Sequence, residues 1–329
     1  MSEELKITEE WDKVFPKSEK VNHRKVTFKN HFGITIVADM YEPKEYEGKL
    51  PAIALSGPYG AVKEQSSGLY AQEMAERGFL TIAFDPSFTG ESSGTPRYMT
   101  SYDFNVEDFQ SAVDYLIGLD NVDSDKIAII GICGWGGMAL QTACIDTRIK
   151  ATVCSTMYDM SRVAGNGYND AQDNEEARYT QRVALNTQRN NDYKTGEYAL
   201  AGGVIDTLPE DAPQFIKDYY AYYKTPRGYH KRSLNSNGGW AVQTHTSMMN
   251  TRLFTYSNEI RNAVMIVHGE NAHSCYMGKD AYANMIKDNR YTDNKELVIV
   301  PNATHCDLYD QKDKIPFDKI ESFLKENLK

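Results

Sequence analysis

Short apolar runs alternate with amphipathic segments along much of the chain. The runs have the length of strands and are bounded by turn residues, so they predict buried strands at residues 51–55, 79–84, 127–130, 149–154, 264–269 and 297–301. Two alternating segments, residues 25–29 and 34–41, predict a hairpin that turns near Gly33. Amphipathic stretches predict helices at about residues 68–77, 106–119 and 316–328. Strands separated by helices are typical of an α/β fold whose mostly parallel sheet is covered on both faces.

The strand pattern breaks between about residues 158 and 262. This segment is rich in Tyr, Asn, Asp, Gln and Arg, and four tyrosines lie within residues 219–223, ahead of Trp240. Such aromatic residues suit an aromatic or amphipathic ligand, and they serve equally to pack one layer on another. We therefore predict an N-terminal extension over residues 1–21, an α/β core made of residues 22–157 and 263–329, and a mostly helical cap inserted as residues 158–262.

Composition narrows the range of partners. The chain has 329 residues and a net charge of −10, so we expect no nucleic-acid partner. No apolar run approaches the roughly 18 residues of a membrane span, and no signal pattern opens the chain. Five cysteines without paired spacing indicate a reducing, cytoplasmic location. The sequence has no CxxC, HExxH, Walker or GxGxxG motif, so we expect no metal and no other cofactor. The expected partner is a small-molecule substrate, with no membrane involved; the oligomeric state, a homo-oligomer included, is left open.

The segment with the most chemical information is Gly131-Ile132-Cys133-Gly134-Trp135-Gly136-Gly137. It lies between a predicted buried strand and a predicted helix that begins near Met138. A strand, a tight glycine-rich turn and a helix, in this order, form the context of a nucleophile elbow. The elbow presents one side chain at a helix N-terminus, where backbone N–H groups and the helix dipole favour an anion.

Two frames of this segment compete for the nucleophile position. In the first, Cys133 takes the position at the usual distance from the strand, but the bulky Trp135 stands where a small residue is wanted. In the second, every flanking residue is small, but Trp135 takes the position and an indole cannot attack a carbonyl. A thiolate can carry out acyl transfer when a histidine or a helix N-terminus lowers its pKa. Free cysteines are also often only small buried residues, so both roles of Cys133 stay open.

The candidate general base is His305, which follows the last predicted strand by about four residues, the usual place for the base of this architecture. Its orienting acid is less well defined. The usual aspartate position, in the loop after residues 264–269, falls on Asn271 or Ala272, with Glu270 adjacent. Asp159, just after an earlier strand, is the alternative acid. The sequence therefore shows an incomplete catalytic triad.

The remaining candidates concern the pocket and the oxyanion hole. The hole needs two backbone N–H donors, one of which follows the nucleophile: Gly134 in the first frame and Gly136 in the second. The other is expected from the loop after residues 51–55, and Tyr59 is the candidate because Pro58 has no N–H. His273 is a candidate pocket residue, whereas we expect the neighbouring His268 to be structural.

Four segments, residues 56–70, 84–92, 131–137 and 302–310, carry a family resemblance. Together they resemble bacterial dienelactone-hydrolase-like α/β hydrolases, and the resemblance extends from about residue 22 to the end of the chain. It implies the α/β-hydrolase fold, no cofactor and hydrolysis of an ester, lactone or similar carbonyl substrate. Dienelactone hydrolases use a cysteine in G-x-C-x-G, which Cys133 matches. Relatives nearer this chain often carry the nucleophilic serine where Trp135 stands here.

Three hypotheses about function follow from these residues. The first is a hydrolase in which Cys133 is the nucleophile, His305 the base, Glu270 or Asp159 the orienting acid, and the Tyr59 and Gly134 N–H groups the oxyanion hole. The second is an enzyme without a covalent step, in which His305 activates water and Trp135 forms a wall of the pocket. The third is a non-catalytic protein that keeps the pocket for binding a ligand.

Overall fold

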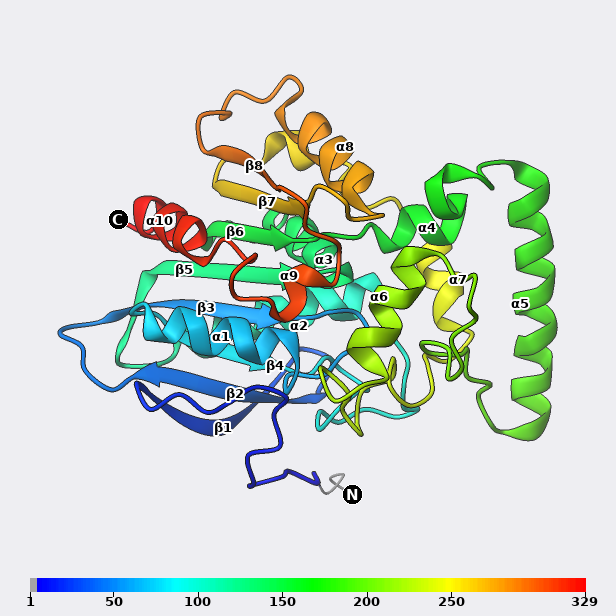
Figure 1. The fold of residues 1–329 in the computed structure, drawn as a ribbon, viewed down its shortest axis with the longest axis horizontal. Coiled ribbons are helices and arrows are strands. Elements are labelled where there is room, and N and C mark those ends of the chain that lie inside the picture. Colours follow the sequence, from blue (N-terminus) through cyan, green and yellow to red (C-terminus); the bar gives the residue numbers. More distant parts are fainter. Residues whose placement is uncertain (1–4) are drawn as a thin grey trace.

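One sheet of eight strands runs through residues 5–329, the part of the chain that the computed structural model describes (Figure 1). In chain order the strands are β1 (Val21–Lys29), β2 (Thr35–Pro43), β3 (Leu50–Ser56), β4 (Leu80–Phe84), β5 (Val122–Ile132), β6 (Ile149–Ser155), β7 (Ala263–Gly269) and β8 (Lys295–Val300). Their order in the sheet is β1-β2-β4-β3-β5-β6-β7-β8. The β1–β2 and β2–β4 pairs are antiparallel, and all other neighbours are parallel. The predicted hairpin and mostly parallel sheet are confirmed.

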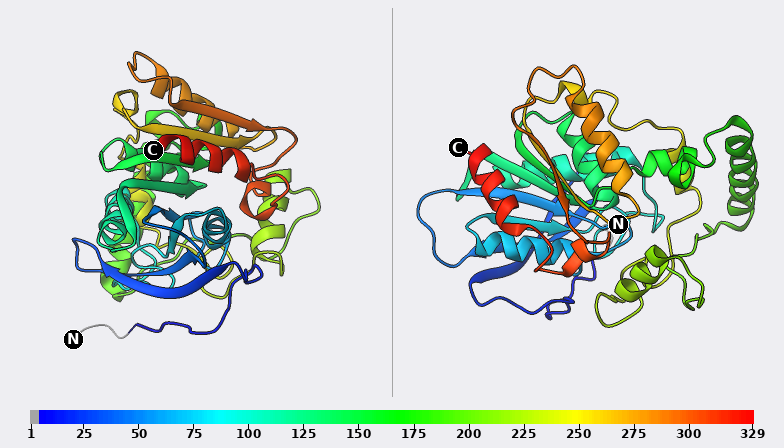
Figure 2. Two further views of the ribbon diagram at one scale, coloured as in Figure 1. Left: turned by 90° about the vertical axis from the view of Figure 1, so that its left-hand side faces the viewer. Right: turned by 45° about the horizontal axis from the view of Figure 1, so that its top comes forward.

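Helices cover both faces of the sheet (Figures 1 and 2). On one face lie α1 (Ser66–Glu76) and α10 (Phe317–Asn327). On the other lie α2 (Tyr102–Ile117), α3 (Gly134–Ala143) and α8 (Cys275–Ile286). The buried strands serve both layers, because successive side chains of a strand point to opposite faces.

Strand β5 illustrates this division. Ile127 and Ile129 pack in the core on the side of α2, whereas Ala128 and Ile130 pack in the core on the side of α1. A strand buried on both faces is apolar at every position, which explains why its sequence shows a continuous apolar run rather than alternation.

Helix α8 is an element that the sequence analysis did not predict. Its buried positions are small or sulfur-containing residues: Cys275, Met277, Gly278, Ala281 and Met285. Such residues give a weaker apolar stripe than the Val, Leu and Phe positions of α2. The helix is therefore defined more by its packing against β7 and β8 than by its own pattern.

Residues 158–262 contain four α-helices in the described chain: α4 (Met160–Asn166), α5 (Glu175–Thr195), α6 (Gln214–Tyr223) and α7 (Thr244–Met249). We call this segment the insertion. Helix α5 lies away from the sheet, whereas α6 lies beside the short helix α9 (Asp307–Asp310) (Figures 1 and 2). Two 3₁₀ turns, Tyr168–Asp170 and Ser257–Glu259, complete its helical structure. The insertion thus approaches the end of the sheet at which the strand-to-helix loops of the core lie.

The N-terminal extension packs on the core over the residues that are described. Phe15 is buried in the core on the α1 side, and the backbone N–H of Val14 donates to the Glu64 carbonyl at 3.0 Å. Residues 1–4 of the predicted extension lie outside the described residues. Within residues 5–329, no helix combines the length and the apolar character that crossing a membrane requires.

Candidate active site

Cys133 occupies the tight turn between β5 and α3. Its backbone has φ 59° and ψ −126°, a conformation that a residue with a side chain adopts at a cost in free energy. The turn is so close that a Cβ on Gly131 would lie 1.9 Å from the Trp135 carbonyl oxygen. The turn is held by the Cys133 carbonyl, which accepts from the N–H groups of Gly136 at 2.8 Å and Tyr158 at 2.9 Å. This geometry corresponds to the first of the two frames, with the buried Cys133 at the tip of the elbow.

The structure places Trp135 in the core rather than at a cavity wall. Its side chain is fully buried and packs edge-on against Phe84 and Phe109, at ring-centroid distances of 5.5 and 5.2 Å. Gly57 makes room for it, since a Cβ on Gly57 would lie 2.8 Å from the Trp135 Cβ. Trp135, the bulky residue that counted against the first frame, is therefore accommodated in the core between α2 and the sheet.

Backbone and side-chain donors converge on the Cys133 sulfur. Burial raises the pKa of the Cys133 thiol, and hydrogen bonds from the Tyr309 hydroxyl, the Gly134 and Tyr59 N–H groups and the Tyr219 hydroxyl oppose this rise. The two N–H groups are those expected to form an oxyanion hole. They meet at one point because β3 and β5 are neighbours in the sheet and their following loops lie side by side.

His305 lies in the same cluster, immediately before α9. Its side chain is 1 % exposed, and its Nε2 atom is 3.1 Å from the Tyr309 hydroxyl oxygen. Among the described residues, Cys133 and His305 are linked through the Tyr309 hydroxyl rather than by a hydrogen bond of their own. The structure thus brings together the predicted nucleophile and base, with a tyrosine between them.

No carboxylate orients His305 within the described chain. Its Nδ1 atom faces two hydroxyls, Ser274 Oγ at 2.6 Å and Thr156 Oγ1 at 3.0 Å. Glu270 is exposed and accepts a hydrogen bond from the Asn302 N–H at 3.0 Å.

The alternative acid, Asp159, caps α4. Its Oδ1 atom accepts from the N–H groups of Ser161 at 3.0 Å and Arg162 at 2.9 Å. Neither predicted acid is hydrogen-bonded to His305 in the described chain; each carboxylate accepts from backbone N–H groups instead.

The imidazoles of the site are held uncharged. Burial, with smaller effects of His273 and His268, holds the pKa of His305 well below its usual value. Burial likewise lowers the pKa of His273 to about 4. His273 lies with its ring centroid 5.0 Å from that of His305, and its Nε2 atom is 3.1 Å from the Tyr219 hydroxyl. His268 is fully buried at the end of β7, with Nε2 3.0 Å from the Met157 carbonyl.

A cavity of about 270 Å³ opens at Cys133. Four tyrosines contribute to its lining: Tyr59, Tyr158, Tyr219 and Tyr309. Residues of the insertion complete it, among them Met160 at the start of α4, Val204, and Asn235. The cavity therefore combines core residues, which carry the candidate chemistry, with insertion residues, which shape the space above it.

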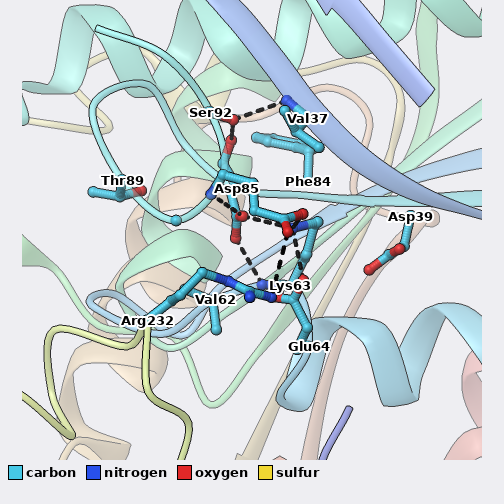
Figure 3. Close-up of polar contacts among 12 residues, drawn as sticks. Val37, Asp39, Val62, Lys63, Glu64, Phe84, Asp85, Thr89, Ser92 and Arg232 are labelled. Carbon is cyan, nitrogen blue, oxygen red and sulfur yellow. Dashed lines mark hydrogen bonds and ion pairs between the residues drawn. The ribbon is translucent and has the colours of Figure 1, made fainter. Parts of the chain in front are cut away.

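We call residues 57–65 the oxyanion loop. A second polar cluster lies buried at the end of this loop and includes its residues Lys63 and Glu64 (Figure 3). The Lys63 ammonium is 2.7 Å from a carboxylate oxygen of each of Glu64, Asp85 and Glu91. Burial by itself would raise the pKa of Glu64. The positive charges of Lys63, Arg232 and Lys25 nevertheless hold this pKa well below its usual value. These three carboxylates lie close enough together to hold a metal ion, but the Lys63 ammonium lies among them. Lys63 thereby ties the oxyanion loop to the loop after β4.

The insertion holds the oxyanion loop from its other side. Arg232 reaches Glu64 at 2.7 Å, and Asn235 Nδ2 donates to the Tyr59 carbonyl at 2.8 Å. The Trp240 ring lies 4.5 Å from the Tyr59 ring, measured between centroids. The segment that carries Tyr59, the candidate oxyanion-hole donor, is therefore held by the buried cluster on one side and by the insertion on the other.

Several residues of this site did not emerge from the sequence analysis. Ser274 and Thr156 look like ordinary loop hydroxyls, and only the fold brings them to His305 Nδ1. Tyr309 carried a usable signal, since it lies four residues after His305 at a helix start. Tyr219 was noted only as part of a tyrosine-rich segment.

Comparisons with known proteins agree with this architecture. Protein PA2218 of Pseudomonas aeruginosa is 52 % identical over 327 residues, covering 99 % of this chain and 86 % of that protein. Its crystal structure matches with a TM-score of 0.93 at 50 % identity, covering 99 % of this chain and 100 % of that chain. The α/β hydrolase GrgF from Penicillium matches with a TM-score of 0.74 at 20 % identity, covering 93 % of this chain and 99 % of that chain, which shows the shared fold.

A shorter match links the chain to thiohydrolase aneE of Aspergillus aculeatus, 30 % identical over 107 residues, which cover 32 % of this chain and 34 % of that protein. The family model of the X-Pro dipeptidyl-peptidases (S15 family) matches residues 33–307. With the sheet order and elbow described above, these matches make the chain an enzyme with the α/β-hydrolase fold. The chain belongs to the S15 family of X-Pro dipeptidyl-peptidases.

Proposed function

We propose that the protein hydrolyses a small ester, thioester or lactone through a covalent acyl–Cys133 intermediate. The observation that carries the proposal is the convergence on the Cys133 sulfur of the Tyr59 and Gly134 N–H groups and of the Tyr309 hydroxyl, which is paired with His305. The resemblance to dienelactone-hydrolase-like enzymes and the partial similarity to a thiohydrolase both support acyl chemistry. Neither determines the substrate.

The first step of the proposed reaction forms a carbon–sulfur bond. Cys133 Sγ attacks the substrate carbonyl carbon, while its proton passes by way of the Tyr309 hydroxyl to His305 Nε2. The carbonyl oxygen takes the negative charge and is held by the Tyr59 and Gly134 N–H groups. Collapse of this intermediate breaks the bond to the leaving alcohol or thiol, which takes the proton from His305.

The second step returns the enzyme to its starting state. Water attacks the acyl–Cys133 thioester, giving one proton to His305, and the departing sulfur takes that proton back. In this arrangement Nδ1 of His305 donates its proton to Ser274 Oγ at 2.6 Å, which leaves Nε2 as the acceptor for Tyr309. Ser274 therefore does the orienting work of a triad acid without supplying a charge.

The test is turnover of p-nitrophenyl acetate combined with mass spectrometry of the acyl-enzyme. Cys133→Ala removes the nucleophile and should abolish both turnover and acylation, whereas His305→Ala and Tyr309→Phe should lower the rate by about 10²–10⁴-fold if they carry the proton. Cys144→Ser is the matched thiol control, because Cys144 lies at the far end of α3 and should leave the rate unchanged. Full activity of Cys133→Ala, together with loss in His305→Ala, would instead favour direct activation of water by His305.

A further inference from the structure

The cavity at Cys133 is built without a charged side chain. Among residues 5–329, its lining consists of tyrosines, Cys133, Met160, Val204, Asn235 and two glycines, and includes no Asp, Glu, Lys or Arg. Most ligand sites contain a few polar groups that fix the ligand's orientation, and burying a charged group is costly unless it is paired and hydrogen-bonded. Here the polar residues of the lining are tyrosines and Asn235, all of them uncharged.

The nearby imidazoles do not supply the missing positive charge. Burial lowers the pKa of His273 to about 4 and holds the pKa of His305 well below its usual value, so both rings are neutral at pH 7. Burial also raises the pKa of Tyr219 and of Tyr309 well above the usual value, so their hydroxyls remain neutral donors. The basic residues of the buried cluster, Lys63 and Arg232, are occupied by carboxylates behind the oxyanion loop.

An anionic substrate would therefore lose its hydration at Cys133 and find no cation there. Asp218 and Arg227 act with opposite charges on the neighbouring Cys306, Arg227 is paired with Asp310, and neither lines the described cavity. A neutral planar acyl group meets the opposite situation. The rings of Tyr158 and Tyr219 contribute aromatic surface to the lining, and the hydroxyls of Tyr219 and Tyr309 are uncharged and paired with His273 and His305.

We propose that the cavity selects uncharged acyl groups, aromatic or unsaturated ones in particular, and rejects acyl groups that carry a carboxylate. This inference rests on the proposed function, since it concerns the acyl group delivered to Cys133. The selection arises from the absence of a cation in a cavity walled by tyrosines, and the insertion determines it by supplying Val204, Met160 and Asn235.

Alkylation of Cys133 tests the charge selection without requiring turnover. The full-length protein is treated with iodoacetamide or iodoacetate, which differ mainly in charge, and the modified peptide is quantified by mass spectrometry. Each rate is divided by the rate with 2-mercaptoethanol, an uncharged thiol, at the same pH, which removes the intrinsic difference between reagents. We expect Cys133 to prefer the neutral reagent by about tenfold or more, because the anion must be desolvated without a partner. A normalised ratio of about one would overturn the inference.

A cation placed in the cavity should reverse the preference. Val204→Lys should lower the normalised ratio by about tenfold, since it pairs the iodoacetate carboxylate, whereas Val204→Gln should leave the ratio near that of the wild type. Met160→Lys and Met160→Gln form a second pair at another wall of the cavity, in case a substitution at Val204 prevents folding. An equal effect of Lys and Gln at both positions would refute the role assigned to charge.

A matched pair of esters separates this inference from the proposed function. p-Nitrophenyl methyl succinate and p-nitrophenyl hydrogen succinate have the same acyl chain, but only the second carries a carboxylate. We expect hydrolysis that depends on Cys133 and a kcat/KM about tenfold or more higher for the methyl ester. If neither ester is hydrolysed, the proposed function is overturned. The alkylation ratio would still decide the charge selection in that case. Equal hydrolysis of both esters through Cys133 would support the proposed function and overturn the charge selection alone.

Discussion

Ser274 offers the sharpest test of how this site activates its base. Its Oγ atom lies 2.6 Å from His305 Nδ1, the position that a carboxylate oxygen takes in a charged triad. Burial holds the pKa of His305 well below its usual value in the native protein. We therefore expect the acid limb of the kcat/KM profile below pH 6.5, because the base is lost only when the pH falls through this lowered pKa. Ser274→Asp should move that limb to higher pH.

The size of the movement follows from the geometry. A carboxylate in place of Ser274 would lie about 4 Å from the centre of the imidazolium charge, which corresponds to about 4 kcal/mol at an effective dielectric constant of about 20. At about 1.36 kcal/mol per pH unit, this attraction alone would give a movement of about 3 pH units. Burial of the new carboxylate removes part of that gain. We therefore expect the limb to move upward by about 1 to 3 pH units.

The assay is the pH dependence of kcat/KM for p-nitrophenyl acetate, with NMR titration of the imidazole signals as an independent measurement. Ser274→Asn is the matched control, because it has the shape of aspartate but no charge. His305→Gln identifies the signal of His305 among the seven histidines of the chain. Coincident acid limbs in the Asp and Asn variants would refute the view that a charge at position 274 would raise the pKa of His305.

Two further predictions concern stability. Trp135→Ser should lower the free energy of unfolding by about 3–5 kcal/mol, because the indole fills the core beside Phe84. Urea unfolding measures this loss, and labelling of residue 135 by a fluorophosphonate would contradict the assignment of its side chain to the core. Lys63→Met should cost about 3–5 kcal/mol at pH 7 and less at pH 5, where protonation relieves the unpaired carboxylates. Urea unfolding at both pH values measures this loss in free energy. Lys319→Met, at an exposed lysine, is the control and should change the free energy of unfolding by about zero. A larger loss for Lys63→Met at pH 5 than at pH 7 would contradict the prediction.

The sequence determined the sheet and the elbow because both depend on local patterns. Apolar runs such as residues 127–130 can be buried only as strands covered on both faces, and the structure places them at the centre of the sheet. The glycines around Cys133 are required by the close approach of strand and helix, so they are visible without knowledge of the fold. His305 was named as the candidate base for the same reason, since its distance from the last strand is a local property.

The choice between Cys133 and Trp135 required the tertiary structure. Both frames had one defect in the sequence, and only packing shows that the indole fits between Phe84 and Phe109 while the thiol faces the cavity. The partners of His305 also depend on the fold. The sequence analysis looked for a carboxylate, but the loops after β6 and β7 bring the hydroxyls of Thr156 and Ser274 to the imidazole.

What the sequence by itself determined is therefore the α/β architecture, the elbow and the candidate base, because short-range periodicity and glycine spacing encode them. What only the tertiary structure decided is the identity of the side chain at the elbow, the uncharged partners of His305 and the uncharged cavity. These properties arise where segments distant in the sequence meet, as when Tyr59, Cys133 and Tyr309 converge on one thiol. Their burial then determines which groups carry charge, and no local pattern of residues records that burial.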